Sequence, residues 1–329
     1  MLSRVADSIY WVGRYLERAE NYARFIDVNF NLSLDLPPDL NEQWEPLVAA
    51  TGDYEAYSGR YKDFGRESVI YFMAFDKENP SSIISAISKA RENARIIREN
   101  LSRETWEKLN EIYHFVKNGK RKKVWQRDDP MDFFIKTKYS IQLLYGIADN
   151  SVARTQGWYF SQLGQFLERA DKTSRILDVK YHILLPSVEE VGATIDFLHW
   201  TALLKSVSGF NTYRRLYGTI DPPGVVEFLV LDKSFPRSIL FCLKEAERCL
   251  QRLSGTASEA GYGYTNKAEK RLGALRSELE FADVHDVIHF GLHEFMDSIQ
   301  VKINNISDAI YDKFFKITNN FVQAQNNQE

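Results

Sequence analysis

The chain has 329 residues, 44% of them hydrophobic and 26% charged, which is ordinary for a folded globular protein. Its net charge is -3 and its pI is near 6.1, so it lacks the basic excess of a nucleic-acid-binding protein. The 17 glycines and 9 prolines are few for this length, which favours long helices over strands and turns.

Helical periodicity dominates the chain from its start. In residues 3–34, Val5, Ile9, Val12 and Leu16 alternate by four and three, as on the buried face of a packed helix. The other segments with helical signals are, in chain order, short stretches around Trp44 and Tyr54, then 67–75, 83–101, 104–117, 130–146, 151–184, 188–209, 211–216, 225–231, 235–253, 267–281 and 284–315. No segment gives a convincing run of strands, so we predict an all-α protein of one or two helical bundles.

Two halves and a tail are predicted from the breaks between these segments. The N-terminal half covers residues 1–149, the C-terminal half covers 150–318, and the polar tail at 319–329 is expected to be frayed. The basic run at 117–123 is interpreted as a solvated loop, with an anion-binding patch as the alternative. Residues 221–224, Asp-Pro-Pro-Gly, are interpreted as a sharp turn.

The chain shows neither a signal peptide nor a stretch of roughly 20 apolar residues that could span a bilayer. We therefore expect a cytoplasmic protein with no membrane partner and no nucleic-acid partner, and leave a homo-oligomer open. The sequence also lacks a P-loop, Gly-x-Gly-x-x-Gly, Gly-x-Ser-x-Gly and Cys-x-x-Cys, so no cofactor is expected.

The stretch RYLERAENYARFID near the start of the chain returns near its middle as QFLERADKTSRILD. Aligning Gly13 with Gly164 sets an offset of 151 residues. The charged residues that then coincide are Glu17 with Glu168, Arg18 with Arg169, Arg24 with Arg175 and Asp27 with Asp178, while Glu20 meets Asp171. Generic amphipathicity would repeat apolar positions but not the same charges, so we predict an internal duplication of a long Glu/Arg-rich helix.

In each copy the polar residues follow a four-three spacing and form a stripe beside the apolar face. Glycine inside a helix costs about 1 kcal/mol relative to alanine, so Gly13 and Gly164 are expected to allow close approach of another backbone or a ligand. Two interpretations of the stripes stay open. The charges form structural ion pairs such as Glu20 with Arg24, or the stripes face a shared groove where carboxylates hold an amine and arginines hold a carboxylate or phosphate.

Further candidates lie outside these two copies. The segment KARENARIIREN resembles the motif loosely and puts Glu92 and Arg95 on one helical flank. Arg214 is a candidate for binding phosphate or a peptide carboxylate, with a surface arginine as the alternative. Arg237 is predicted in the first turn of a helix, where it assists an anion at the N-terminus or pairs with Asp232.

Three of the six histidines fall in one segment of the predicted helix at 284–315. His285, His289 and His293 follow at steps of four residues, a metal-chelating spacing on one helix face. The Glu-x-x-His pairs of di-iron bundles are missing, however. These histidines are therefore weak metal candidates, with a place on a helix flank as the alternative, and no metal is assigned.

Five motifs occur in order between residues 1 and 315: LSRVADSIYWVGRYLERAENYARFIDV, SKARENARIIRENLSRETWEKLNEIY, GWYFSQLGQFLERADKTSRILDV, SGFNTYRRLYG and FLVLDKSFPRSILFCLKEAE. Together they resemble the bacterial alpha-E domain family, which is all-helical. The resemblance implies an ATP-grasp family enzyme as partner, a transglutaminase-like protease as a further one, and a role in making or modifying peptide or amide bonds. One departure is Gln165, which stands where the first copy has Arg14, so the two halves are not expected to be equivalent.

The leading hypothesis is a helical subunit of such a system that binds a peptide, an amino acid or an activated acyl intermediate. Whether it is itself an enzyme stays open; in a catalytic version, Glu17 or Glu168 orients or deprotonates an amine. The predicted binding residues are Arg14, Arg18, Glu20, Arg24, Glu92, Arg95, Arg169, Asp171, Arg175, Arg214 and Arg237. The alternatives are a non-enzymatic adaptor that docks the ATP-grasp enzyme and a carboxylate/histidine metalloprotein.

Overall fold

The computed structural model describes residues 1–35, 44–182, 194–256 and 264–316. Its helices are α1 (Ser3–Asp35), α2 (Glu45–Thr51), α3 (Tyr54–Ser58), α4 (Arg66–Ala74), α5 (Ile83–Ile96), α6 (Arg103–Arg121), α7 (Met131–Ser151), α8 (Gln156–His182), α9 (Thr194–Ser206), α10 (Phe210–Tyr217), α11 (Pro222–Val230), α12 (Ile239–Ser254), α13 (Lys267–Phe281), α14 (Val284–Phe290) and α15 (Leu292–Ile310). These ranges contain no strand, and the predicted all-α fold class is confirmed. The tail predicted at 319–329 and the helix ends predicted at 183–184 and 188–193 lie outside the described residues.

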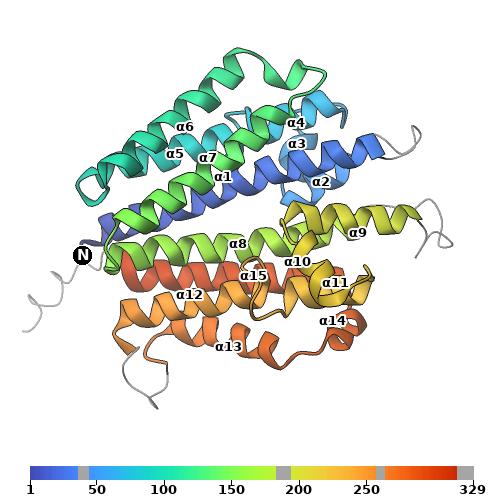
Figure 1. The fold of residues 1–329 in the computed structure, drawn as a ribbon. Coiled ribbons are helices and arrows are strands. Elements are labelled where there is room, and N and C mark those ends of the chain that lie inside the picture. The colour runs from blue at the N-terminus through green and yellow to red at the C-terminus, as the bar shows by residue number, and fades with distance from the viewer. Residues whose placement is uncertain (36–43, 183–193, 257–263, 317–329) are drawn as a thin grey trace, which may run out of the picture.

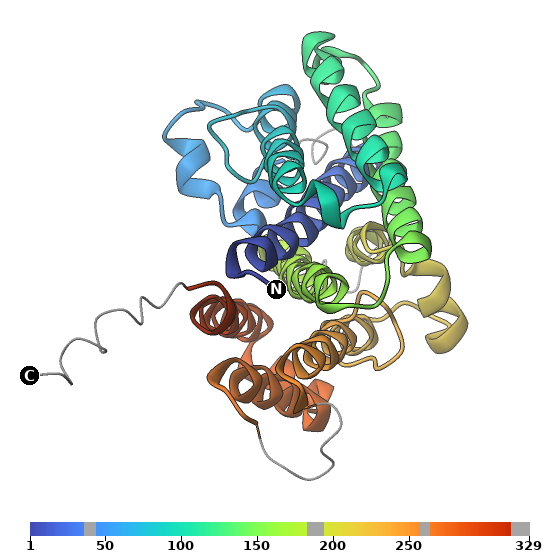
Figure 2. The ribbon, with the colours of Figure 1, turned by 90° about the vertical axis from the view of Figure 1, so that its left-hand side faces the viewer.

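Two long helices, α1 and α8, lie side by side at the centre of the molecule (Figure 1). Helices α5, α6 and α7 pack with α1 into one four-helix bundle, and α12, α13 and α15 pack with α8 into a second. Seen nearly along the helices, the two bundles lie on opposite sides of the central pair (Figure 2). Short helices cross between them, since α2 packs on α8 and α9 packs on α1. The α1–α8 contact is therefore the seam that joins the two bundles.

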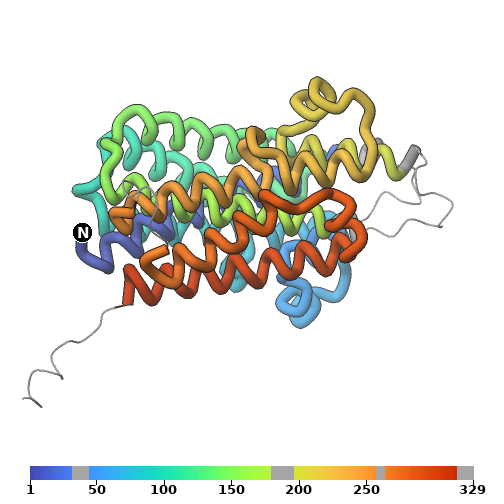
Figure 3. The backbone as a smooth tube through the Cα atoms, turned by 90° about the horizontal axis from the view of Figure 1, so that it is seen from below, coloured from blue at the N-terminus to red at the C-terminus, as the bar shows by residue number. Residues whose placement is uncertain are grey.

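Helices α1 and α8 run parallel, and their contacts advance in step along the chain. The N-terminal ammonium of Met1 donates to Gln156 near the start of both helices. Further along both helices, Arg169 donates to Glu17. The tube view shows the long helices aligned along a common direction (Figure 3). A parallel arrangement of two similar helices brings equivalent residues to the same level, so the two polar stripes lie next to each other.

The repetition extends beyond α1 and α8 to the turns before α5 and α12. The sequences FDKENPSSI and LDKSFPRSI match there at an offset of 156 residues. In the first turn, Ser82 caps α5 and its hydroxyl donates to the carbonyl oxygen of Asp76 at 2.6 Å. In the second, Ser238 caps α12 and donates to the carbonyl oxygen of Asp232. The same N-terminal capping turn thus precedes α5 in the first bundle and α12 in the second.

Two of the predicted connecting segments are helical instead. Helix α6 continues to Arg121, through most of the basic run predicted as a loop at 117–123, because Gly119 leaves room for the ring of Phe133 against the helix. Residues 221–224 do not form a free turn either. Their two prolines occupy the first turn of α11, where no backbone donor is needed, and their aspartate is its N-cap.

Candidate functional site

Helices α1 and α8 meet at two glycines, one from each helix. A Cβ built on Gly13 would overlap the carbonyl oxygen of Ser161, and one built on Gly164 would overlap that of Tyr10. The two contacts are equivalent under the offset of 151 residues, so the copies are related by a pseudo-twofold axis along the helices. The predicted close approach at both glycines is confirmed, and the approaching backbone is that of the other copy.

Beside these glycines, two glutamates and two arginines form reciprocal ion pairs. Arg18 donates to both carboxylate oxygens of Glu168, from Nε at 2.6 Å and from Nη2 at 3.0 Å. Arg169 donates in the same way to Glu17, at 2.8 Å and 2.9 Å. This two-pronged geometry is a strong form of the arginine–carboxylate interaction. The adjacent Glu and Arg of each copy therefore bind the opposite copy, and the two stripes face each other.

A second layer of charge lies beside Glu17. Glu20 accepts hydrogen bonds from Arg24 at 2.7 Å and from Arg237 at 2.5 Å. Arg237, from the segment before α12, also reaches Glu17 at 3.3 Å. The predicted pairing of Arg237 with Asp232 is wrong, because the Arg237 guanidinium points into the α1 stripe and the Asp232 carboxylate accepts from backbone N–H groups of its own loop.

The corresponding layer beside Glu168 is built differently. Asp171 accepts from Lys172 at 2.7 Å and from Arg175 at 3.0 Å. Lys172 also lies 3.5 Å from Glu168, and Arg14 donates to Glu168 from Nε at 2.8 Å. Lys172 was not among the predicted site residues, because its place in the first copy is taken by an asparagine and the repeat gives no signal for it.

The carboxylates of this network are closed off from solvent. Glu17, Glu20 and Glu168 are each 0% exposed. Burial alone would raise the pKa of Glu17, but Arg169 and Arg237 outweigh it and hold that pKa below its ordinary value. The pKa of Glu168 is held well below its ordinary value by the cations around it. A general base works best with a pKa near the working pH, so these carboxylates are poor bases in this state.

Helix α7 adds three polar contacts that the sequence prediction missed. They are Lys138 to Asp27 at 2.9 Å, Gln142 to Glu20 at 2.8 Å and Tyr145 to Glu17 at 3.3 Å. Positions 138, 142 and 145 follow a four-three spacing, so they share one helix face. A polar stripe on a helix that is otherwise largely apolar was the signal that could have found them.

Three predicted binding residues lie outside the network. Glu92 and Arg95 pair with each other at 2.7 Å on the outer face of α5, where their side chains are 51% and 68% exposed. Arg214 is exposed on α10, and its guanidinium lies over the ring of Phe210. Helical spacing placed these charges correctly along their helices, but it does not reveal which face a neighbouring helix covers.

The three histidines do not share one continuous helix. Gly291, with a φ of 97°, separates α14 from α15, so the single helix predicted there is wrong. His285 and His289 are exposed on α14, whereas Nδ1 of His293 lies 2.6 Å from a carboxylate oxygen of Asp178. In the described part of the chain, no group of three or more His, Cys, Asp or Glu residues is placed to hold a metal ion.

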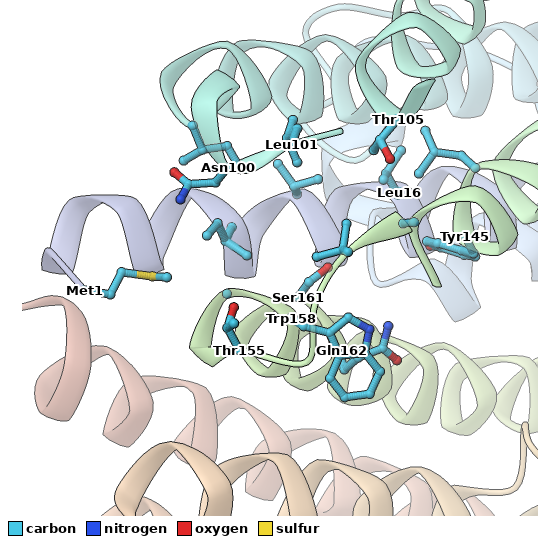
Figure 4. A pocket seen from close by; sticks show the side chains of 17 residues that line it. Met1, Leu16, Asn100, Leu101, Thr105, Tyr145, Thr155, Trp158, Ser161 and Gln162 are labelled. Carbon is cyan, nitrogen blue, oxygen red and sulfur yellow. The ribbon is translucent and has the colours of Figure 1, made fainter. Parts of the chain in front are cut away.

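Two of the pockets beside the central helix pair lie against α1. One, of about 350 Å³, lies between α1 and α15 and includes Arg14 and Arg18 in its wall. The other, of about 120 Å³, lies between α1, α7, α8 and the segment that joins α5 to α6, and it is mainly apolar. Figure 4 shows the second pocket, with Leu16 and Leu101 on one side and Trp158 on the other. The first pocket is thus a place where Arg14 and Arg18 of the stripe can be reached from outside.

Fold and site together define an all-α protein built on a duplicated Glu-Arg helix whose two copies are joined by buried ion pairs. The chain belongs to the Alpha-E family, described as a predicted alpha-helical domain with a conserved ER motif, and the family model matches residues 1–315. In this chain, Glu17-Arg18 and Glu168-Arg169 are two such Glu-Arg pairs, and their reciprocal contacts give the motif a physical role.

The chain is also similar to uncharacterized proteins of Mycobacterium bovis and Mycobacterium tuberculosis, at 24% identity over 333 residues in both cases. These matches cover 93% of this chain but 36% of each relative, so the chain spans about a third of their length. No solved structure matches it. Among the described residues, no helix is both long enough and apolar enough to cross a membrane.

Proposed function

We propose that this chain is a non-catalytic helical scaffold that docks an ATP-grasp family enzyme in a system making or modifying peptide or amide bonds. One observation carries the non-catalytic role. Glu17 and Glu168 are 0% exposed, and an arginine fork occupies the oxygens of each. Carboxylates held in this way join two helices and are not free to take a proton from a substrate amine.

The partner's class rests on the family resemblance, which implies an ATP-grasp enzyme and, as a second partner, a transglutaminase-like protease. The comparisons support a role within something larger, because the matching region is 36% of the mycobacterial relatives and is joined there to further chain. An ATP-grasp partner would supply the ATP-binding site for which this sequence has no motif. A partner that consumes ATP also fits a location in the cytoplasm.

The test is reconstitution of the chain with an ATP-grasp family enzyme from the same organism, measuring complex formation by co-purification and ATP-dependent bond formation separately. Glu17→Gln and Glu168→Gln are compared with the surface variant Glu92→Gln, below the unfolding temperature of each. A scaffold predicts that folded variants keep both complex and activity. A hundredfold loss of activity with an intact complex would instead make these glutamates catalytic and overturn the proposal.

A second function, substrate binding by the predicted arginines, is favoured by one specific observation. Arg14 and Arg18 line the pocket between α1 and α15, so part of the stripe is reachable from outside. This role does not need a free carboxylate, and it is compatible with a scaffold that presents a ligand to its partner.

A further inference from the structure

The pocket between α1 and α15 combines an aromatic wall with a charged one. Its volume of about 350 Å³ lies within the range of small-molecule sites. The aromatic residues are Tyr10, Trp11, Tyr311 and Phe315, and the polar ones are Arg14, Arg18, Asn304, Ser307 and Asp308. Helix α1 forms one side of the pocket, and the end of α15 with the helical turn after it forms the other. Each side contributes both aromatic and polar residues.

The two arginines present unused donors in this pocket. Arg14 uses Nε for Glu168 and Nη1 for Tyr10 at 3.2 Å and Ser307 at 3.0 Å. Arg18 uses Nε and Nη2 for Glu168. Within the ranges that the structure describes, neither Nη2 of Arg14 nor Nη1 of Arg18 has a hydrogen-bond acceptor. Neither nitrogen is among the buried side-chain atoms of the described residues that lack a partner, so both are open to the pocket and can donate to water or to a ligand there.

The charge around Glu168 is unbalanced. Two carboxylates lie here, Glu168 and Asp171. The cations that form ion pairs with one or both of them are Arg14, Arg18, Lys172 and Arg175. Four cations against two carboxylates leave an excess positive charge beside a largely buried interface, where charge is poorly solvated. A negative group in the pocket would reduce that cost. The excess beside Glu17 is smaller, with Arg24, Arg169 and Arg237 against Glu17 and Glu20.

We propose that this pocket binds a singly charged carboxylate joined to an apolar group, as at the C-terminal residue of a peptide. Nη2 of Arg14 and Nη1 of Arg18 donate to the carboxylate, and the rings of Trp11 and Tyr311 contact the apolar group. Asp308 in the same wall repels additional negative charge, which favours one carboxylate over a polyphosphate. This assigns a ligand class that the scaffold function does not require.

The probe is N-acetyl-L-phenylalanine, with its uncharged amide as the matched control, measured by titration calorimetry on the full chain. Charge-assisted hydrogen bonds are roughly twice as strong as neutral ones, so we expect the acid to bind about tenfold or more tightly than the amide. Equal affinity for the acid and the amide, or binding of neither, would overturn the proposal.

The chain itself suggests the decisive variant, because Gln165 occupies the place of Arg14 in the second copy. There Gln165 donates to Glu17 at 3.4 Å inside the same packed interface. Arg14→Gln should therefore fold, with Arg18 still paired to Glu168, and should bind the acid about tenfold or more weakly than the wild type. Unchanged affinity of this folded variant for the acid would refute the site.

Two further variants keep the test open if Arg14→Gln fails to fold. Trp11→Ala should weaken binding of the acid severalfold; it keeps both arginines paired with Glu168 and removes only the ring that lies 5.5 Å from the Arg14 guanidinium. Asp308→Asn should strengthen binding by removing a like charge. The exposed Arg95→Gln is the control and should leave affinity unchanged. Wild-type affinity in Trp11→Ala and Asp308→Asn would also refute the site. Complex formation with the ATP-grasp enzyme is measured separately, so failure of the scaffold function and failure of the pocket are distinguished.

Discussion

The two copies of the motif bury the same glutamate and neutralise it in different ways. Glu17 receives an arginine fork from α8 and a second arginine, Arg237, from outside the central helix pair. Glu168 receives the equivalent fork from α1, but its additional cations, Arg14 and Lys172, come from the central pair itself. The fork is thus the shared feature of the duplication, while the further cations come from different parts of the fold.

The differences between the copies compensate each other. Where the second copy's loop carries Arg237, the first has a serine, at position 81. Conversely, the first copy has a cation, Arg14, at the position where the second copy has the uncharged Gln165. Because Arg14 belongs to α1 and not to a loop, the outer edge of its guanidinium faces the pocket beside α15. The inequality that Gln165 predicted from the sequence therefore has a structural counterpart, because Arg14 lines the pocket beside α15 while its counterpart Gln165 donates to the buried Glu17.

The largest expected effect is on stability when either buried glutamate loses its charge. Glu17→Gln and Glu168→Gln keep the shape but leave arginines buried without a counter-charge, which costs about 3–5 kcal/mol when one partner of a buried pair is removed. We expect the greater loss for Glu168→Gln, because three cations contact Glu168 and two contact Glu17. Urea denaturation measures both. Losses below about 1 kcal/mol in both variants would show that the network contributes little to stability.

Sequence patterns predicted the helices well because periodicity reports directly on burial along one element. The matching charges at an offset of 151 residues revealed the duplication, and the glycines revealed the close contact. What the patterns could not give was the neighbour across each face. Arg95 lies three residues after a glutamate and Arg18 lies directly after one. The side chain of Arg95 is nevertheless 68% exposed, whereas that of Arg18 is 16% exposed. Arg237 was placed at a helix start, but its partners are residues more than two hundred positions away.

A second comparison tests the part of the interface that is symmetric. Gly13→Ala and Gly164→Ala each force a Cβ against a carbonyl oxygen of the other helix, and overpacking of this kind costs about 1–3 kcal/mol. We expect similar losses from the two, in contrast to the unequal glutamates. Gly146 is the control, because nothing lies within 4 Å of its added Cβ and alanine there should be neutral or slightly stabilising. Tolerance of one alanine but not the other, measured by thermal unfolding, would argue against the pseudo-twofold contact.

Acid should weaken the network with a definite sign. The folded-state pKa of Glu17 lies below its ordinary value of 4.5, and that of Asp171 is lowered from 3.8 to about 2 because Lys172 and Arg175 outweigh the effect of burial. Their contribution to stability is therefore fully present above pH 5 and is lost as the pH falls through the ordinary value towards the folded one. A buried glutamate whose folded pKa lies well below 4, such as Glu168, should account for about 0.7 kcal/mol between pH 5 and pH 4.

Thermal unfolding followed by circular dichroism from pH 7 to pH 3 measures this loss. The midpoint should stay level down to about pH 5 and then fall. Glu168→Gln has one titrating carboxylate fewer, so its midpoint should fall less steeply than that of the wild type. A midpoint that rises between pH 5 and pH 3 would contradict the lowered pKa values.

The smallest effect is expected where the motif resembles the central stripes but lies on the surface. Arg95→Ala removes an exposed pair with Glu92 and should cost about 0.5 kcal/mol or less, with no difference from the wild type at 1 M salt. Denaturation at low and high salt measures both values. A loss above 1 kcal/mol that grows with protein concentration would mean that this face of α5 is buried between copies of the chain, because only association makes the stability of a single chain depend on concentration.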